Sequence, residues 1–110
     1  MSRKRPKPAS LHEHYQVGQA IKEAERAICN VLRYSRCFYA TEIDKLLRAN
    51  EHLRRLKSRL DDELFADYPQ LPSTPGFYVY YSDKPENSAA ALEMVEHFEP
   101  SSTVDKGQSD

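Results

Sequence analysis

Apolar positions along residues 10–67 follow helical spacing, and this stretch predicts two long amphipathic helices. It contains no proline and a single glycine, Gly18. Leucines in its second half recur at steps of three or four residues, which places them on one helix face with charged residues over most of the rest. This stripe consists of Leu46, Ala49, Leu53, Leu56, Leu60 and Leu64. We expect the stripe to be buried against another helix.

A similar seam runs through the first half of the stretch, at alternating steps of four and three residues. Ser10 and Glu13 form a capping box at its start, in which each side chain accepts a hydrogen bond from the other residue's backbone N–H. Small side chains at Ala20, Ala24 and Ala27 would let a partner helix approach closely. The pattern is typical of helices packed as in a coiled coil. The seam consists of Val17, Ile21, Ala24, Ile28, Val31, Ser35 and Phe38.

The two helices are expected to meet near Ala40 and Thr41. Thr41 can cap a new helix, and Glu42 would fall inside the apolar stripe if a single helix continued through this point. Both observations favour a turn and an antiparallel helical hairpin. Neither glycine nor proline marks the corner, so one continuous helix of about 58 residues is the alternative. The second helix should end near Asp67, because Tyr68 precedes a proline and is disfavoured in the α conformation.

The C-terminal third of the chain predicts shorter elements. Residues 68–81 combine a proline-rich linker with an aromatic run that we expect to form a short extended segment. That segment would pack over the helices, pair with its mate in a dimer, or dock on a partner protein. Residues 82–100 predict a short acidic helix that begins at Pro85 or Ser88, and we expect it to dock on the basic flank of the second long helix. The aromatic run consists of Phe77, Tyr78, Val79, Tyr80 and Tyr81.

The two ends of the chain predict no packed structure. The first nine residues are basic and contain two prolines, and the last ten are small and polar, so both are expected to be disordered. The chain therefore divides into a basic arm (1–9), the helical hairpin (10–67), the linker with the aromatic segment (68–81), a short acidic helix (82–100) and a tail (101–110).

Length and composition limit the chain to one small domain. Of the 110 residues, 39% are hydrophobic and 30% are charged, which is typical of a soluble helical protein with a modest core. The longest apolar runs are far shorter than the ~20 residues of a transmembrane helix. No apolar segment follows the basic N-terminus, as it would in a secretory signal. We therefore expect a cytoplasmic protein with no membrane contact.

Charge is distributed unevenly along the chain. Residues 1–59 carry 14 Lys and Arg and 6 Asp and Glu, a net charge of +8, whereas residues 60–110 carry 2 and 11, a net charge of −9. This asymmetry indicates either that the basic part binds a polyanion or that basic and acidic ends pair between antiparallel subunits. The candidate phosphate contacts are Arg3, Lys4, Arg5, Arg48, Arg55 and Arg59.

The sequence contains no catalytic motif that we recognise. It has no glycine-rich phosphate loop, no nucleophile elbow, no H-E-x-x-H and no C-x-x-C, so we expect no enzymatic activity, no cofactor and no metal. His12 and His14 lie two residues apart and do not share a helix face. Cys29 and Cys37 would lie roughly 12 Å apart along one helix, too far for a disulfide within it. We expect reduced thiols or, alternatively, a bridge between the subunits of a dimer.

The amphipathic seams would expose more apolar surface than one short helix can cover, which indicates a core completed by oligomerisation. We therefore expect an all-α protein in which two hairpins form a dimeric four-helix bundle. The expected function is protein–protein contact, as a self-associating adaptor, assembly or regulatory protein. The alternative is a small dimeric nucleic-acid-binding protein with a basic arm and an acidic end. The expected interface residues are Val17, Ile21, Ile28, Val31, Phe38, Leu46, Leu53, Leu56, Leu60 and Leu64.

Overall fold

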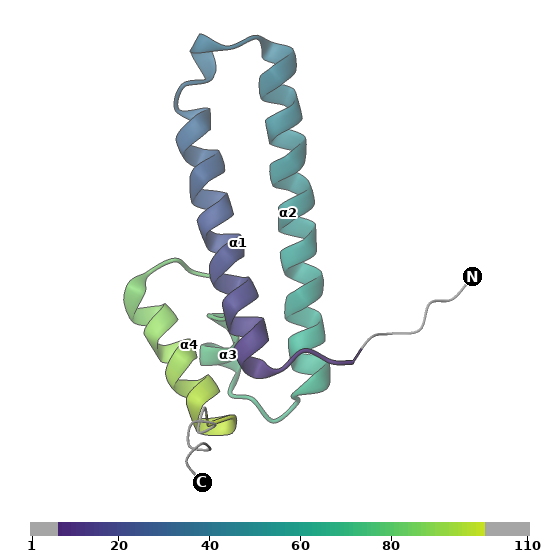
Figure 1. Ribbon diagram of the computed structural model, residues 1–110, viewed down its shortest axis with the longest axis vertical. Helices are drawn as coiled ribbons and strands as arrows, with labels where there is room; N and C mark the ends of the chain where they lie inside the picture. The colour runs from purple at the N-terminus through teal and green to yellow at the C-terminus, as the bar shows by residue number, and fades with distance from the viewer. Residues whose placement is uncertain (1–6, 101–110) are drawn as a thin grey trace, which may run out of the picture.

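A computed structural model, which describes residues 7–100, shows an antiparallel helical hairpin with two shorter helices at one end (Figure 1). Helix α1 comprises Leu11–Leu32 and helix α2 comprises Ala40–Asp67. Helices α3 (Ser73–Phe77) and α4 (Pro85–Phe98) pack where α1 begins and α2 ends. The described residues contain no strand. The all-α hairpin is confirmed, and the alternative of one continuous helix is wrong.

The turn between the long helices begins earlier than the sequence indicated. α1 ends at Leu32, and residues 35–37 form a single turn of 3₁₀ helix. α2 has Tyr39 at its N-cap, so Thr41 lies inside the helix and does not cap it. The connecting residues are mostly Ser, Cys, Tyr and Phe, whose helix propensity is below that of alanine and leucine. The predicted capping box of α1 and the predicted end of α2 are both confirmed.

The aromatic segment that we expected to be extended is helical and turned. α3 ends at Phe77, and residues 78–80 form a turn at the base of the hairpin. The N–H groups of Tyr78 and Val79 donate to carbonyls of α3, so the backbone is satisfied locally without a strand partner. Val79 and Tyr80 are almost completely buried. The prediction of a strand is therefore wrong, and this turn lies at the centre of the core.

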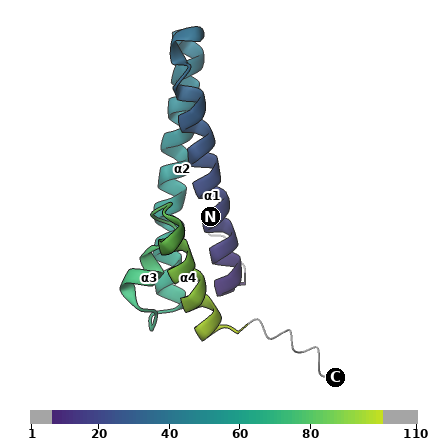
Figure 2. The same ribbon diagram turned by 90° about the vertical axis from the view of Figure 1, so that its left-hand side faces the viewer.

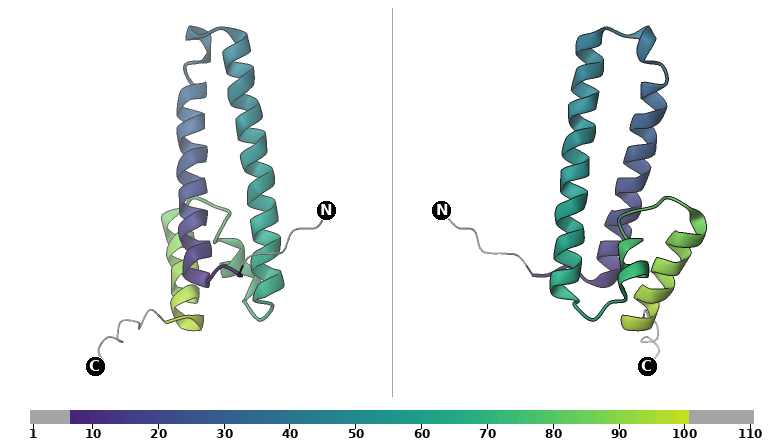
Figure 3. Two further views of the ribbon diagram at one scale, coloured as in Figure 1. Left: turned by 45° about the vertical axis from the view of Figure 1, so that its right-hand side comes forward. Right: turned by 180° about the vertical axis from the view of Figure 1, so that it is seen from behind.

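Helix α4 packs on α1 and α3, not on the basic flank of α2 (Figure 3). It begins at Pro85, as predicted, and buries Ala91, Met94 and Val95 on its inner face. Burying an aliphatic side chain contributes roughly 1.5–3 kcal/mol, whereas an exposed ion pair contributes about 0–1 kcal/mol. Apolar contact therefore determined where α4 docks, and the expectation based on its acidic surface was wrong.

Two rows of inward-facing side chains join α1 and α2, and we call them the inner seam. Each row follows alternating steps of three and four residues, so it stays on the side that faces the other helix. Its members are buried or half-buried. They are Leu11, His14, Gly18, Ile21, Glu25, Ile28 and Leu32 on α1, and Ile43, Leu46, Asn50, Leu53, Lys57, Leu60 and Leu64 on α2.

Three polar members of the inner seam, Glu25, Lys57 and His14, have partners inside the protein. Lys57 Nζ lies 2.7 Å from Glu25 Oε2, across the two helices. The same ammonium lies 4.8 Å from the centroid of the Tyr81 ring. His14 Nδ1 and the hydroxyl of Tyr80 form a buried hydrogen bond. These pairings explain how the seam accepts residues that a search for apolar periodicity did not include.

Gly18 allows the buried turn to reach α1. A Cβ atom at this position would collide with the carbonyl oxygen of Val79, a backbone atom that cannot move without the whole turn. A glycine inside a helix costs roughly 1 kcal/mol relative to alanine. Here that cost is offset by the close contact between α1 and the turn.

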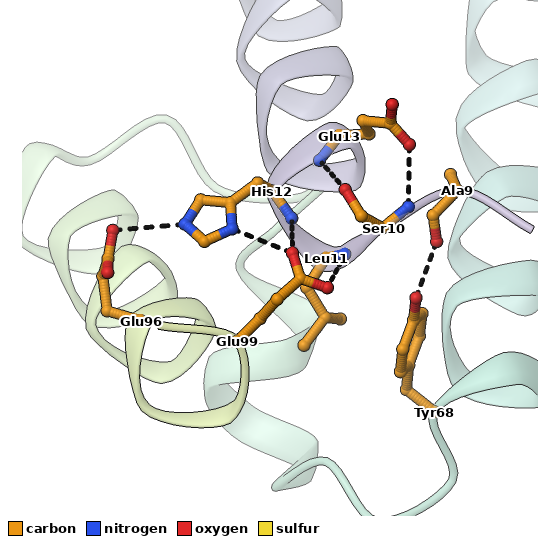
Figure 4. Close-up of polar contacts among 8 residues, drawn as sticks. All are labelled: Ala9, Ser10, Leu11, His12, Glu13, Tyr68, Glu96 and Glu99. Atoms are coloured by element: carbon orange, nitrogen blue, oxygen red, sulfur yellow. Dashed lines mark hydrogen bonds and ion pairs between the residues drawn. The ribbon is translucent and has the colours of Figure 1, made fainter. Parts of the chain in front are cut away.

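Glu99 joins the end of α4 to the start of α1 (Figure 4). Its carboxylate accepts hydrogen bonds from the N–H groups of Leu11 (3.0 Å) and His12 (2.9 Å), which have no acceptor within the first turn of a helix. His12 Nδ1 lies 2.8 Å from the same carboxylate, and His12 Nε2 lies 3.2 Å from Glu96. The two ends of the folded region are thereby held together.

These contacts shift the pKa values of two groups in opposite directions. Hydrogen bonds to Glu99 and Glu96 raise the pKa of His12 above 6.5. Burial raises the pKa of Glu99, but the hydrogen bonds from the backbone of His12 and Leu11 outweigh this effect and leave the pKa below its ordinary value. Both shifts favour the ionised pair in the folded protein.

We predict that Gly18→Ala destabilises the protein by about 1–3 kcal/mol, because the added methyl group overpacks the contact with Val79. Helix propensity alone would predict a gain of roughly 1 kcal/mol, so the sign of the change tests the contact. Chemical denaturation followed by circular dichroism measures it. Gln16→Ala serves as the control, because Gln16 is exposed and lies two residues from Gly18. This substitution should change stability little. A more stable Gly18→Ala protein would contradict this packing.

We predict that the stability of the α1–α4 junction depends on pH through His12. Because folding raises the pKa of His12, its contribution is fully present below pH 6.5 and is lost as pH rises through the higher folded-state pKa. Because folding lowers the pKa of Glu99 below 4.5, its contribution is present above that ordinary value and is lost as pH falls through the folded-state value.

Thermal unfolding at about pH 6 and about pH 8.5 spans the range in which the contribution of His12 is lost. The melting temperature of the wild type should fall more between these two pH values than that of His12→Gln. Other histidines contribute equally to both proteins and cancel in the comparison. An identical pH dependence in the two proteins would show that the His12–Glu99 contact does not stabilise the junction.

Candidate interaction surface

The hairpin has one face that the shorter helices cover and one that they leave open. α3 and α4 lie on the same side of the two long helices, and apart from residues 7–10 at the base no described segment crosses the opposite side (Figures 2 and 3). Lys22 marks the covered side of α1, because its Nζ donates to the carbonyl of Tyr78 at 2.7 Å. Ala24 lies two residues further, about 200° around the helix, and therefore faces the open side.

Apolar side chains of α1 follow a second pattern of three- and four-residue steps on the open face. Together with two apolar residues of α2 that lie seven positions apart, they form a row that we call the outer stripe. Val17, Val31 and Leu56 are 43%, 45% and 46% exposed. The α1 part of the row is about 21 Å long. Contiguous exposed apolar surface with a polar rim marks sites of protein–protein contact. The outer stripe consists of Val17, Ala20, Ala24, Ala27 and Val31 on α1, and Ala49 and Leu56 on α2.

The turn end of the hairpin, which we call the tip, also exposes large apolar side chains. Tyr34, Phe38 and Tyr39 are more than half exposed, and Leu47 is 47% exposed. The shorter helices lie at the other end of the hairpin (Figure 1), so within the described chain the tip consists of two helices and their connection alone. The tip therefore lacks the third layer that covers apolar side chains at the base.

The predicted interface residues divide between the outer stripe, the tip and the inner seam. Val17, Val31 and Leu56 belong to the outer stripe, and Phe38 belongs to the tip. The others belong to the inner seam and pack within the chain. These are Ile21, Ile28, Leu46, Leu53, Leu60 and Leu64. Prediction from the sequence did not separate the inner seam from the outer stripe, because the two lie side by side on each helix. It also missed the polar residues that complete the inner seam.

The aromatic segment predicted to dock a partner is mostly part of the core. Val79 and Tyr80 are buried, and Tyr78 and Tyr81 are half-buried. Phe77 is exposed, but its ring stacks on that of Tyr81 with the centroids 4.7 Å apart. This segment therefore serves mainly to hold the base of the hairpin together.

The predicted phosphate contacts lie in separate parts of the chain. Arg3, Lys4 and Arg5 fall outside the described residues. Arg48, Arg55 and Arg59 are exposed and lie within about 40° of one another around α2. Arg55 lies 3.5 Å from Glu51, a carboxylate that also pairs with Arg54. The basic flank of α2 is thus partly neutralised.

A polar cavity of about 530 Å³ lies on the covered side, between α1, α2 and residues 82–83. Lys22 lines it, and burial lowers the pKa of this side chain. Its ammonium also lies 3.3 Å from Gln19 Oε1 and 3.4 Å from Ser88 Oγ, besides its bond to Tyr78. Since an ammonium has three hydrogens to donate, protein acceptors engage all of them. We interpret Lys22 as a link between α1 and the C-terminal segment.

Other candidate chemistry is limited. Within residues 7–100, no group of three or more His, Cys, Asp or Glu is arranged to hold a metal ion. Cys29 and Cys37 are free and exposed. None of the described helices is both long and apolar enough to cross a membrane. The outer stripe and the tip are therefore the surfaces from which a function can be inferred.

Comparison with known proteins finds no matching protein family, no matching curated protein and no matching solved structure.

Proposed function

We propose that this chain is a non-enzymatic helical module that acts by protein–protein contact and self-associates through its outer stripe as a dimeric four-helix bundle. The observation that carries the proposal is the exposure of Val17, Val31 and Leu56 on the open face of the hairpin. The apolar side chains of the outer stripe lie on the open face of the two helices. A second hairpin is the simplest element that would bury them.

The size of the open face suits a second copy. Between Val17 and the tip it is about 30 Å long and about 20 Å wide, the width of two helices. The projected area of roughly 600 Å² approaches the ~800 Å² that each partner buries in a standard interface. Completing the burial of Val17, Val31 and Leu56 would contribute roughly 1 kcal/mol each.

The alanines of the outer stripe favour a helix as the opposing element. Ala20, Ala24 and Ala27 follow helical steps, so they form a shallow groove along α1 into which side chains or another backbone can pack. In a twofold dimer the same groove belongs to both copies, and each copy supplies what the other requires. Adaptor or assembly roles would then use the exposed aromatic side chains at the tip.

Size-exclusion chromatography with light scattering tests the proposal directly. We predict a particle of twice the chain mass of 12.7 kDa, with a protein absorbance spectrum. The chain has no tryptophan, so co-purified nucleic acid would raise the ratio of absorbance at 260 nm to that at 280 nm conspicuously. A monomer would refute self-association, and a nucleic-acid spectrum under the peak would support the alternative function.

We predict that Leu56→Asp dissociates the dimer without unfolding the hairpin, because Leu56 is 46% exposed and belongs to the outer stripe. Leu47→Asp is the matched control, since Leu47 is 47% exposed and lies nine residues away, on the opposite side of α2. The measurements are light scattering and the helical signal in circular dichroism. A Leu56→Asp protein that remains dimeric and folded, or a Leu47→Asp protein that dissociates, would place the interface elsewhere.

A buried leucine distinguishes loss of assembly from loss of folding. Leu64 is completely buried in the inner seam, so Leu64→Ala should lower the free energy of unfolding by about 2–5 kcal/mol. This change should be visible in denaturation of the Leu56→Asp background as well, because Leu64 packs within one chain. If Leu64→Ala has no effect on unfolding, the inner seam is not the core of the monomer.

A further inference from the structure

We infer that the two hairpins pair antiparallel, with a twofold axis passing close to Ala24, so that the tip of each copy lies at the level of the base of the other. This inference rests on the proposed self-association through the outer stripe. It adds the direction of the second copy and the residues that meet. Two independent observations lead to it: the order of side chains along the outer stripe, and the distribution of charge along the hairpin.

The α1 part of the outer stripe has the same order of side chains in both directions. From one end to the other it is Val17, Ala20, Ala24, Ala27 and Val31. A twofold axis at Ala24 brings Val17 of one copy opposite Val31 of the other, because each lies seven residues from Ala24. Ala20 and Ala27, at four and three residues from it, fall opposite each other within about one helical rise, 1.5 Å. The stripe is therefore complementary to its own antiparallel copy.

Side-chain size along the stripe agrees with this arrangement. The smallest side chains lie around Ala24, where two helices that cross would be closest. The larger Val17 and Val31 lie further along, where slightly inclined helices diverge and leave more room. Each valine would then fill the space beside the valine of the other copy. An interface of this kind is isologous, which is the usual form of a twofold contact.

Charge along the hairpin favours the antiparallel direction. Residues 26–55, which form the distal half of the hairpin, carry seven Lys and Arg and three Asp and Glu, a net charge of +4. Residues 7–21 and 60–100, which form the base, carry two Lys and ten Asp and Glu, a net charge of −8. A dimer with both tips at one end would bring like charges together at each end. The antiparallel dimer brings a basic tip to an acidic base twice.

Several of the exposed charges lie beside the surface that would be buried. Arg36 and Arg48 are exposed near the tip, and Glu13 is exposed near the base. An axis at Ala24 places residue 36 of one copy at the level of residue 12 of the other, close to Glu13. Such rim charges contribute little to affinity but discriminate between orientations. The uneven charge distribution of the chain thereby favours the antiparallel direction of assembly.

Cysteine cross-linking in the full chain tests the direction. Cys29 and Cys37 are free and exposed, so both are first replaced by serine. Single cysteines are then introduced as Ala24→Cys, Val17→Cys and Val31→Cys, and each protein is treated with a mild oxidant and with a short bis-maleimide. Covalent dimers are resolved by denaturing electrophoresis, and light scattering before treatment establishes whether each protein is dimeric.

We predict that Ala24→Cys cross-links to itself, because the axis brings its two copies together. Val17→Cys and Val31→Cys alone should remain uncross-linked, since in the antiparallel dimer each lies about 21 Å from its own mate along the helix, beyond the reach of a disulfide. An equimolar mixture of these two proteins should cross-link after subunit exchange. Self-cross-linking of Val17→Cys, or no cross-linking of Ala24→Cys, in a protein shown to be dimeric would overturn the antiparallel arrangement.

Salt dependence gives a second readout that needs no substitution. Raising NaCl from about 0.05 M to about 0.5 M screens exposed charges, so the dissociation constant of the antiparallel dimer should increase several-fold. A dimer with both tips at one end should instead become tighter, because its like charges would be screened. Tighter association at high salt would therefore overturn the inference while leaving self-association intact. A monomer at every salt concentration would refute the proposed function itself.

Discussion

The contact between Gly18 and the carbonyl of Val79 is the constraint on which the rest of the fold depends. Without a side chain at position 18, the turn at residues 78–80 lies directly on α1 and buries Val79 and Tyr80. The position of the turn determines where the residues that follow it lie. Helix α4 then packs on α1 and α3 on the same side of the hairpin. One face of the hairpin is covered as a result, and the other is left open.

The core is layered at the base and only two helices thick at the tip. The inner seam also contains polar residues, and midway along the hairpin Lys57 Nζ lies 2.7 Å from Glu25 Oε2. A partly buried ion pair adds little net stability, but shifting the helices would leave both charges without partners, so it restricts their register. Fewer buried contacts towards the tip imply that the tip opens more easily than the base. A partner that covers the open face would stabilise this end most.

The inner seam and the outer stripe lie on different faces of the two long helices and have different roles. The inner seam joins the helices within one chain, and the outer stripe offers the same kind of spacing to a second chain. Because the α1 part of the outer stripe is made of small and β-branched side chains, its exposure costs a monomer less than exposed leucines would, yet a helix can approach it closely. In the proposed dimer, the uneven charge of the chain would favour the antiparallel direction over one that apolar contact alone would accept equally.

The sequence by itself determined that the chain forms a hairpin of two amphipathic helices, that α1 begins with the Ser10–Glu13 capping box, and that α2 ends at Asp67. These features depend on local spacing, capping and the conformational restriction before a proline, all of which act within a few residues. Val17, Val31 and Leu56 were also recognised as interface candidates, although without separation from the leucines of the core.

Only the tertiary structure decided which apolar row faces inward, why a glycine occupies position 18 inside α1, and where the aromatic segment and α4 pack. Each of these outcomes depends on partners far apart in the chain, such as Gly18 with Val79 or Glu99 with the first turn of α1. Periodicity places residues on a helix face but does not state which neighbour that face meets. The open face exists because the turn and α4 occupy the other one, and no local pattern encodes that choice.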